Sequence, residues 1–122
     1  MRRSKLQESI LSMVEMKRIE ALGRQIADRF RPERIILFGS YANGQPTEDS
    51  DVDLLVILPF EGYPFRVASA ILSATNPDFA VDVLARTPEQ IEQRLALGND
   101  FIQEILEQGK VLHEATNAGM GK

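Results

Sequence analysis

The sequence predicts an α/β (α+β) fold in which helices pack on a mixed sheet of three to four strands. Three apolar runs have the length of strands, at residues 33–38, 51–58 and 79–85. A dozen residues with no long helical pattern join the first two runs, which suits antiparallel neighbours. About 20 residues that include a helical pattern separate the second run from the third, which suits a parallel crossover. The chain of 122 residues is long enough for one hydrophobic core.

The first element is a predicted amphipathic helix over residues 4–30. Arg31 and Pro32 end it, because proline disfavours helical backbone in the residue before it. The whole segment 1–32 is assigned to the single domain, followed by a core over 33–113 and a flexible tail over 114–122. The apolar positions of the helix recur at mostly helical spacing and are Leu6, Ile10, Met13, Val14, Ile19, Leu22, Ile26 and Phe30.

Shorter elements are predicted between and after the strands. Thr87 and Gln90 have the spacing of a capping box, with proline at the first helical position between them. The elements are a helical turn over 40–43, a loop over 44–50, helices over 65–74, 88–97 and roughly 100–108, and an edge strand at 111–112. The residues expected to face the core are Val67, Ala70 and Ile71 on the first of these three helices. On the second they are Ile91 and Leu95, with Leu97 as a further candidate, and on the third they are Phe101, Ile102, Ile105 and Leu106.

The composition favours a cytoplasmic protein. The chain has no cysteine, so it has no disulfide framework, and no apolar run is long enough to cross a membrane. Residues 1–34 hold nine Lys and Arg against five Asp and Glu, whereas the remainder is acidic and the net charge is −4. The acidic remainder argues against free-standing nucleic-acid binding. The basic excess suits a solvated helix face or the docking of an acidic partner, with Arg2, Arg3 and Lys5 as candidates.

Carboxylates and a Gly-Ser turn mark the candidate active site. Asp51 and Asp53 are two residues apart at a strand start, so they project to the same side of the sheet. Gly39 and Ser40 follow the first strand, where backbone N–H groups and a hydroxyl can bind an anion. With the predicted strand directions, these residues and Asp82 converge at one edge of the sheet.

The expected chemistry is metal-dependent phosphoryl or nucleotidyl transfer. Mg²⁺ or Mn²⁺ suits an all-oxygen site, whereas zinc prefers His or Cys and this chain offers only His113. Asp51 and Asp53 would hold an ion that bridges the phosphates of a nucleoside triphosphate. Asp82 would complete a second metal site or act as a general base.

These residues resemble the signature of the DNA polymerase beta-like nucleotidyltransferases, in particular the stand-alone minimal nucleotidyltransferases of bacteria and archaea. The resemblance covers about residues 33–113 and rests on Gly39-Ser40, the Asp51-Val-Asp53 pair and the later strand aspartate, Asp82. It implies an αβαβαβ core and Mg²⁺-dependent transfer from a triphosphate, with ATP as the favoured donor. It also implies Asp51, Asp53 and Asp82 as catalytic metal ligands and Gly39 and Ser40 as triphosphate-binding residues.

The resemblance also implies a partner. Many minimal nucleotidyltransferases pair with a small all-helical HEPN protein as its antitoxin, and some transfer AMP onto that toxin. Asn43 and Thr47 stand where related sequences often carry arginine, which removes two candidate triphosphate contacts. Larger relatives carry a helical acceptor domain, so the acceptor site here is expected from a partner chain or a second copy. The alternatives are an antitoxin that neutralises its partner by contact alone and a nucleotide-responsive regulator.

Four other residues have structural explanations that we favour over functional ones. Tyr41 is expected to pack the loop after the first strand, not to stack on a base. Arg66 and Arg86 are expected on the solvated surface, and His113 is expected to have a structural role because it has no ligand-spaced neighbour.

Overall fold

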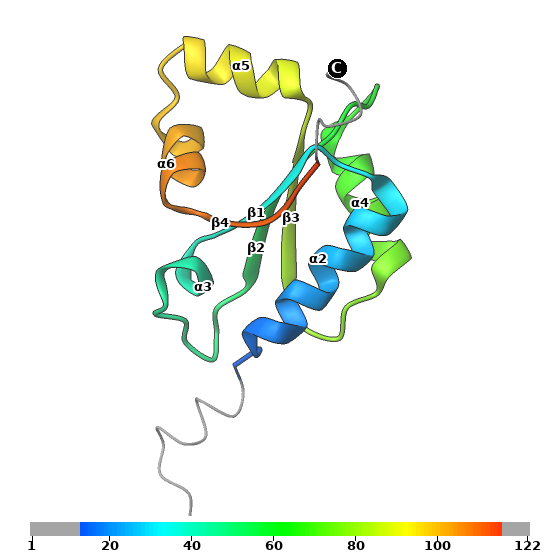
Figure 1. Ribbon diagram of the computed structural model, residues 1–122, viewed down its shortest axis with the longest axis vertical. Helices are drawn as coiled ribbons and strands as arrows, with labels where there is room; N and C mark the ends of the chain where they lie inside the picture. Colours follow the sequence, from blue (N-terminus) through cyan, green and yellow to red (C-terminus); the bar gives the residue numbers. More distant parts are fainter. Residues whose placement is uncertain (1–12, 116–122) are drawn as a thin grey trace, which may run out of the picture.

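In the computed structural model, which describes residues 13–115, four strands form one mixed sheet in the order β3-β2-β1-β4 (Figure 1). β2 pairs antiparallel with β1 and parallel with β3, so both predicted strand relationships are confirmed. β4 pairs antiparallel with the other side of β1, with an irregularity between Ile35 and Ile36. The strands are β1 (Arg34–Phe38), β2 (Val52–Ile57), β3 (Val81–Arg86) and β4 (Lys110–Glu114).

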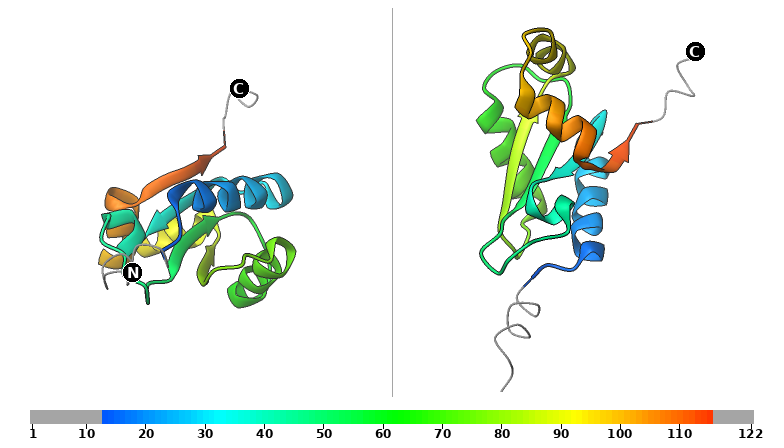
Figure 2. Two further views of the ribbon diagram at one scale, coloured as in Figure 1. Left: turned by 90° about the horizontal axis from the view of Figure 1, so that it is seen from below. Right: turned by 90° about the vertical axis from the view of Figure 1, so that its left-hand side faces the viewer.

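Helices cover both faces of this sheet because the central strands are apolar on both sides. α2 (Met16–Phe30) and α4 (Pro64–Thr75) pack on one face, and α5 (Pro88–Ala96) and α6 (Asp100–Gln108) on the other (Figure 1). In the right-hand view of Figure 2, α6 lies across the strands. Alternate residues of the central strands therefore divide between two clusters, one with Ile35, Leu37, Leu54 and Val56 and the other with Ile36, Leu55 and Ile57.

Local signals in the sequence set most of the helix ends. α2 ends at Phe30, and Arg31 adopts the left-handed conformation before Pro32. At the start of α5, the Thr87 hydroxyl accepts from the Gln90 backbone N–H and the Gln90 side chain accepts from the Thr87 N–H, both at 3.0 Å. The predicted capping box is therefore confirmed.

The first helix is shorter within the described residues than the sequence predicts. The prediction of a continuous helix over 4–30 is wrong at residues 13–15, which are not helical, and α2 begins at Met16. The Val14 backbone N–H donates to the Tyr41 hydroxyl at 3.1 Å, so a tertiary hydrogen bond holds this segment outside the helix. Residues 1–12, with the candidate docking residues Arg2, Arg3 and Lys5, lie outside the described part of the chain.

Four side chains that were predicted to face the core are exposed. Ala70 is exposed on α4, and Phe101 is 52% exposed on α6. Leu95 and Leu97 are 40% and 86% exposed, so Ile91 is the one buried residue of α5. The reason is geometric, because each of these short helices buries a narrower stripe than the apolar pattern of the sequence suggests.

The strand boundaries also differ from the prediction by a few residues. Phe79 lies before β3 and packs against the core cluster, with the Arg18 guanidinium 5.1 Å from its ring centre. β4 is longer than the predicted pair at 111–112 and reaches Glu114, one residue into the predicted tail; residues 116–122 lie outside the described part of the chain. Among the described helices, none has both the length and the apolar character needed to cross a bilayer.

Two glycine substitutions test how α6 and α2 pack against the sheet. A Cβ at Gly109 would lie 2.5 Å from the Ile105 carbonyl oxygen and 2.5 Å from Ile36 Cγ2. Gly109→Ala should therefore lower the free energy of unfolding by about 1–3 kcal/mol, as overpacking does. At Gly23, inside α2, a Cβ meets Leu112 at an ordinary 3.4 Å, so Gly23→Ala should stabilise by up to about 1 kcal/mol.

Urea unfolding of the two variants and the wild type measures both effects. Equal stability of the Gly109→Ala variant and the wild type would show that the end of α6 does not pack tightly against Ile36 of β1.

Candidate active site

Strand register places the central carboxylate of the site. Asp53 on β2 pairs with Phe38, the last residue of β1, on one side and with Asp82 on β3 on the other. Because side chains alternate along a strand, Asp53 lies on the face of the sheet that carries Leu55 and Ile57, beneath α5 and α6. The predicted convergence of β1's end with the starts of β2 and β3 is thus confirmed for Asp53 and Asp82.

The turn after β1 is built around Asp53. Gly39 has φ of +78°, which an L side chain rarely adopts, and it immediately precedes α3 (Ser40–Asn43). A Cβ at this position would collide with the Asp53 carboxylate. Two features therefore require glycine at position 39. The backbone has a positive φ, and the Asp53 carboxylate occupies the space that a side chain would need. Ser40, the predicted phosphate donor, follows directly and is half-buried.

Burial and neighbouring negative charge act together on Asp53. Burial raises the pKa of the Asp53 carboxyl above its ordinary value, and the carboxylates of Asp82 and, to a lesser extent, Asp51 raise it further. Asp53 is half-buried, whereas Asp51 and Asp82 are exposed at the edge of the sheet. The folded protein therefore concentrates negative charge at this edge, around the carboxyl of Asp53.

These carboxylates have the chemistry of a hard-cation site. Their oxygens are the ligands that Mg²⁺ and Mn²⁺ prefer, and a bound cation would offset the repulsion that raises the pKa of Asp53. Asp51 lies in the loop just before β2, not on the strand itself. Within residues 13–115, no three Asp, Glu, His or Cys side chains are already arranged to hold a metal ion. Asp53 and Asp82 are adjacent by register, and Asp51 is close enough to act on Asp53 electrostatically.

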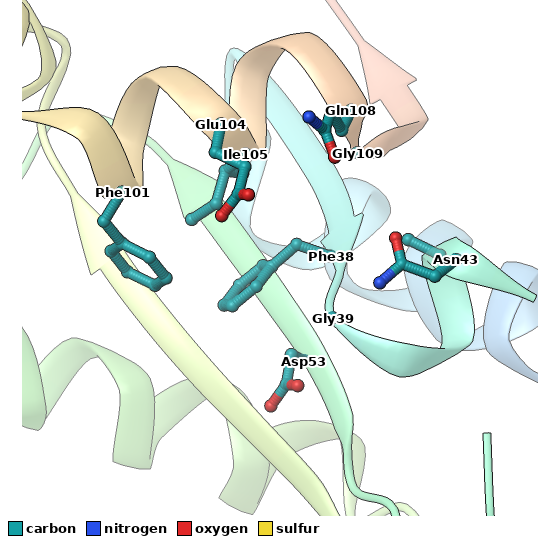
Figure 3. Close-up of a pocket in the computed structure, with 10 residues that line it drawn as sticks. Phe38, Gly39, Asn43, Asp53, Phe101, Glu104, Ile105, Gln108 and Gly109 are labelled. Atoms are coloured by element: carbon teal, nitrogen blue, oxygen red, sulfur yellow. The ribbon is translucent and has the colours of Figure 1, made fainter. Parts of the chain in front are cut away.

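A cavity of about 320 Å³ opens beside Asp53 (Figure 3). It lies between the turn and α3 on one side and α6 on the other. In Figure 3, Phe38 from β1 and Phe101 from α6 extend toward the same space, with Asp53 below Gly39. The two rings meet edge to face, with their centres 5.8 Å apart. The lining residues are Phe38, Gly39, Ala42, Asn43, Asp53, Phe101, Glu104, Ile105, Gln108 and Gly109.

Sequence reasoning missed the contribution of α6 to this cavity. Phe101, Glu104 and Gln108 recur at a spacing of three or four residues, which places them on one helix face. That face adjoins the buried stripe of Ile102 and Ile105, and Phe101 was assigned to the stripe itself. The mixed polarity of Phe101, Glu104 and Gln108 was the available signal, since a core stripe would not carry Glu and Gln.

The other residues considered from the sequence have clear positions. Tyr41 is buried and accepts a hydrogen bond from Val14, so its predicted packing role is confirmed. Asn43 lines the cavity, and Thr47 lies in the exposed loop, where its hydroxyl is 3.3 Å from that of Ser50. The prediction that Arg86 is solvated is wrong. Its Nε is buried without a hydrogen-bond partner, and burial, followed by the charge of Arg94, lowers the pKa of its guanidinium.

The family of the chain follows from a domain match that covers most of its length. The family model described as nucleotidyltransferase domain matches residues 19–113, a segment that contains the turn and all three aspartates. The chain therefore belongs to the nucleotidyltransferase domain family and is a nucleotidyltransferase. This finding confirms the resemblance inferred from Gly39, Ser40, Asp51, Asp53 and Asp82.

Two relatives of the chain are named as protein adenylyltransferases. "Putative protein adenylyltransferase MJ0604" of Methanocaldococcus jannaschii is 29% identical over 105 residues, which cover 83% of this chain and all of the relative. Protein adenylyltransferase MntA of Thermococcus cleftensis is 38% identical over 58 residues, which cover 44% of this chain and 57% of the relative.

Solved structures share the fold. A toxin–antitoxin structure with AMP-PNP has a TM-score of 0.53 and 23% identity, over 85% of this chain and 77% of that chain. A mutant of the MntA–HpeT toxin–antitoxin has a TM-score of 0.51 and 20% identity, over 85% of this chain and 76% of that chain. At these identities the comparison confirms the predicted mixed α/β architecture.

The raised pKa of Asp53 leads to a test of stability. Above its folded pKa, Asp53 is ionised in both states, and the native state bears the cost of the buried charge. Between the ordinary and the raised pKa the native state binds more protons than the unfolded state, so the free energy of unfolding falls as pH rises through this window. Asp53→Asn should therefore stabilise the metal-free protein near neutral pH, and the gain should disappear as pH falls to the ordinary aspartate pKa.

Urea unfolding at pH about 7 and at pH about 4, near the ordinary aspartate pKa, measures this difference. Asp49→Asn, which removes the same charge from the exposed loop, is the matched control and should change stability little. A gain from Asp53→Asn that does not depend on pH would contradict the explanation by charge.

Proposed function

We propose that this nucleotidyltransferase uses Mg²⁺ or Mn²⁺ to transfer AMP from ATP to a hydroxyl of a small helical HEPN-type protein, and that it acts as the antitoxin of that protein. One observation carries the proposal: strand register aligns Asp53 with Asp82 beside the turn of Gly39 and Ser40. The names of the relatives support protein adenylylation, because the M. jannaschii relative is matched over its full length. The toxin–antitoxin complexes of the same fold support the role of antitoxin.

Each residue has a distinct role in this mechanism. Asp51 and Asp53 would hold a divalent ion, which when bound polarises the phosphorus under attack. Gly39 leaves the backbone open to the triphosphate, and the Ser40 hydroxyl donates to a phosphate oxygen. Asp82, at the exposed edge of the sheet, orients the acceptor and takes the proton of its hydroxyl. The hydroxyl oxygen bonds to the α-phosphorus, the bond from that phosphorus to the bridging oxygen breaks, and pyrophosphate leaves.

The charge of the site supports the dependence on a cation. Among the described residues that line the cavity beside Asp53, two are acidic and none is basic. Asn43, which lines it, stands where related sequences often carry arginine. A triphosphate at Gly39 and Ser40 would therefore approach a negative surface, and positive charge must come from bound ions or from a partner chain.

Ligand-induced stabilisation tests the metal site. With ATP and Mg²⁺ at about 100 times the dissociation constant, the native state should gain about 2.7 kcal/mol, seen as a higher Tm. Asp51→Asn and Asp53→Asn should each abolish the rise, because each removes a ligand of the ion that binds the triphosphate. Asp49→Asn should keep it. A rise in Tm that survives both substitutions at Asp51 and Asp53 would exclude these residues as metal ligands.

Labelling of the partner tests the transferred group and the biological role. With its proposed HEPN-type partner, the wild type should add one AMP to that protein, and mass spectrometry should detect the added mass. The label should require divalent metal and should be lost in Asp82→Asn as well as in the Asp51→Asn/Asp53→Asn double variant. If the double variant suppresses toxicity in cells as well as the wild type does, neutralisation occurs by contact and the enzymatic proposal is wrong.

A further inference from the structure

The cavity between α3 and α6 extends beyond the Gly39 turn, where the phosphates are proposed to bind, as far as α6. Its volume of about 320 Å³ lies near the lower limit of roughly 300 Å³ for small-molecule sites. Asp53 and Gly39 occupy one end, and Phe101, Glu104 and Gln108 of α6 form the opposite wall (Figure 3). The site therefore has room for a group next to the phosphates.

The negative charge of the α6 wall limits which part of a nucleotide can bind against it. Glu104 carries a carboxylate there, and within residues 13–115 no Lys or Arg lines the cavity to offset it. Phosphates would be repelled from this end, whereas an uncharged ring would not. The triphosphate therefore belongs at Gly39, Ser40 and the metal ligands, and the nucleoside belongs against α6.

Phe101 supplies a surface on which a base can stack. Its ring is 52% exposed although it is a large apolar side chain, and it is absent from both core clusters of the described chain. Its contact with Phe38 is edge to face, with an angle of 83° between the rings. The Phe38 contact therefore orients the ring of Phe101 and leaves ring surface exposed, as a stacking platform needs.

Glu104 lies one helical turn from Phe101, on the same face of α6. A flat ring stacked on Phe101 would present its edge to the Glu104 carboxylate. An ionised carboxylate only accepts hydrogen bonds, so it favours a ring edge that donates them. Adenine has such a donor in its exocyclic amino group, whereas unsubstituted purine, which carries only hydrogen at that position, has none.

We propose that the α6 wall of this cavity is the nucleoside pocket of the enzyme, in which Phe101 stacks the base and Glu104 accepts a hydrogen bond from its exocyclic amino group. The inference rests on the proposed function, because it assigns the base-recognition residues of the same nucleotide site. It makes α6 the element that selects the donor nucleotide, separately from the turn and carboxylates that hold the phosphates.

Calorimetric titration with Mg²⁺ present tests the pocket without relying on activity. The probes are a non-hydrolysable ATP analogue, the corresponding purine riboside analogue, which lacks the exocyclic amino group, and inorganic tripolyphosphate. Phe101→Ala should weaken binding of the ATP analogue about tenfold, the range of one lost base–aromatic stack, and should leave tripolyphosphate binding unchanged. Phe101→Tyr, which keeps an aromatic ring, should bind like the wild type. The matched control is Phe65→Ala, because Phe65 is 65% exposed on α4 and does not line this cavity.

Discrimination between the ATP analogue and the purine riboside analogue tests Glu104. The wild type should prefer the ATP analogue, and Glu104→Gln should reduce that preference because an amide can either donate or accept. Glu107→Gln is the control on the same helix, since Glu107 accepts from Gln103 and does not line the cavity.

The results separate this inference from the function on which it rests. If Phe101→Ala and Glu104→Gln leave ATP-analogue binding and the preference for it over the purine riboside analogue unchanged, while Asp53→Asn abolishes binding, the nucleoside pocket lies elsewhere and only this inference fails. Equal weakening of the ATP analogue and tripolyphosphate by Phe101→Ala would also overturn it. If the wild type binds none of the three probes with Mg²⁺, the proposed function fails as well.

Discussion

The close approach of the Asp53 carboxylate to the Gly39 turn is the constraint on which the rest of the site depends. Asp53 occupies the space that a side chain at position 39 would need, and the turn has a conformation that glycine adopts easily. The turn can therefore pass this close to the carboxylate only because residue 39 has no side chain. The consequence is a half-buried Asp53 with a raised pKa, beside Asp82 on the next strand.

The arrangement of the two helical layers leaves the end of the sheet at Asp53 open to a cavity. α2 and α4 cover one face along the length of the central strands. On the other face, Ile91 of α5 and Ile102 and Ile105 of α6 pack over the Leu55 and Ile57 end of β2, and the cavity opens next to Asp53. The same helix α6 thus buries one side in the core and turns Phe101 and Glu104 toward the cavity. The lining of the cavity and the packing of the core are therefore coupled through a single nine-residue helix.

Electrostatics connects the architecture with the reaction. The site combines carboxylates from two neighbouring strands with a cavity that no basic residue lines within the described chain. Such a surface repels a polyphosphate unless cations bind between the carboxylates and the phosphates. Metal binding, nucleotide binding and relief of the charge on Asp53 are therefore expected to be linked, and a partner chain that carries arginine could add to the positive charge.

The sequence alone determined the strands, their relative directions, the capping box at Thr87 and the meeting of Asp53 and Asp82 at one edge, because these depend on local periodicity, connection length and residue spacing. The tertiary structure decided where α2 begins within the described chain, which side chains of the short helices are covered, and that Arg86 is partly buried. Phe101 is the clearest case: its position next to Ile102 looks like core in the sequence, and only the placement of α6 turns it toward the cavity. Periodicity shows that a helix has an apolar side, but the neighbouring elements decide how wide a stripe they cover.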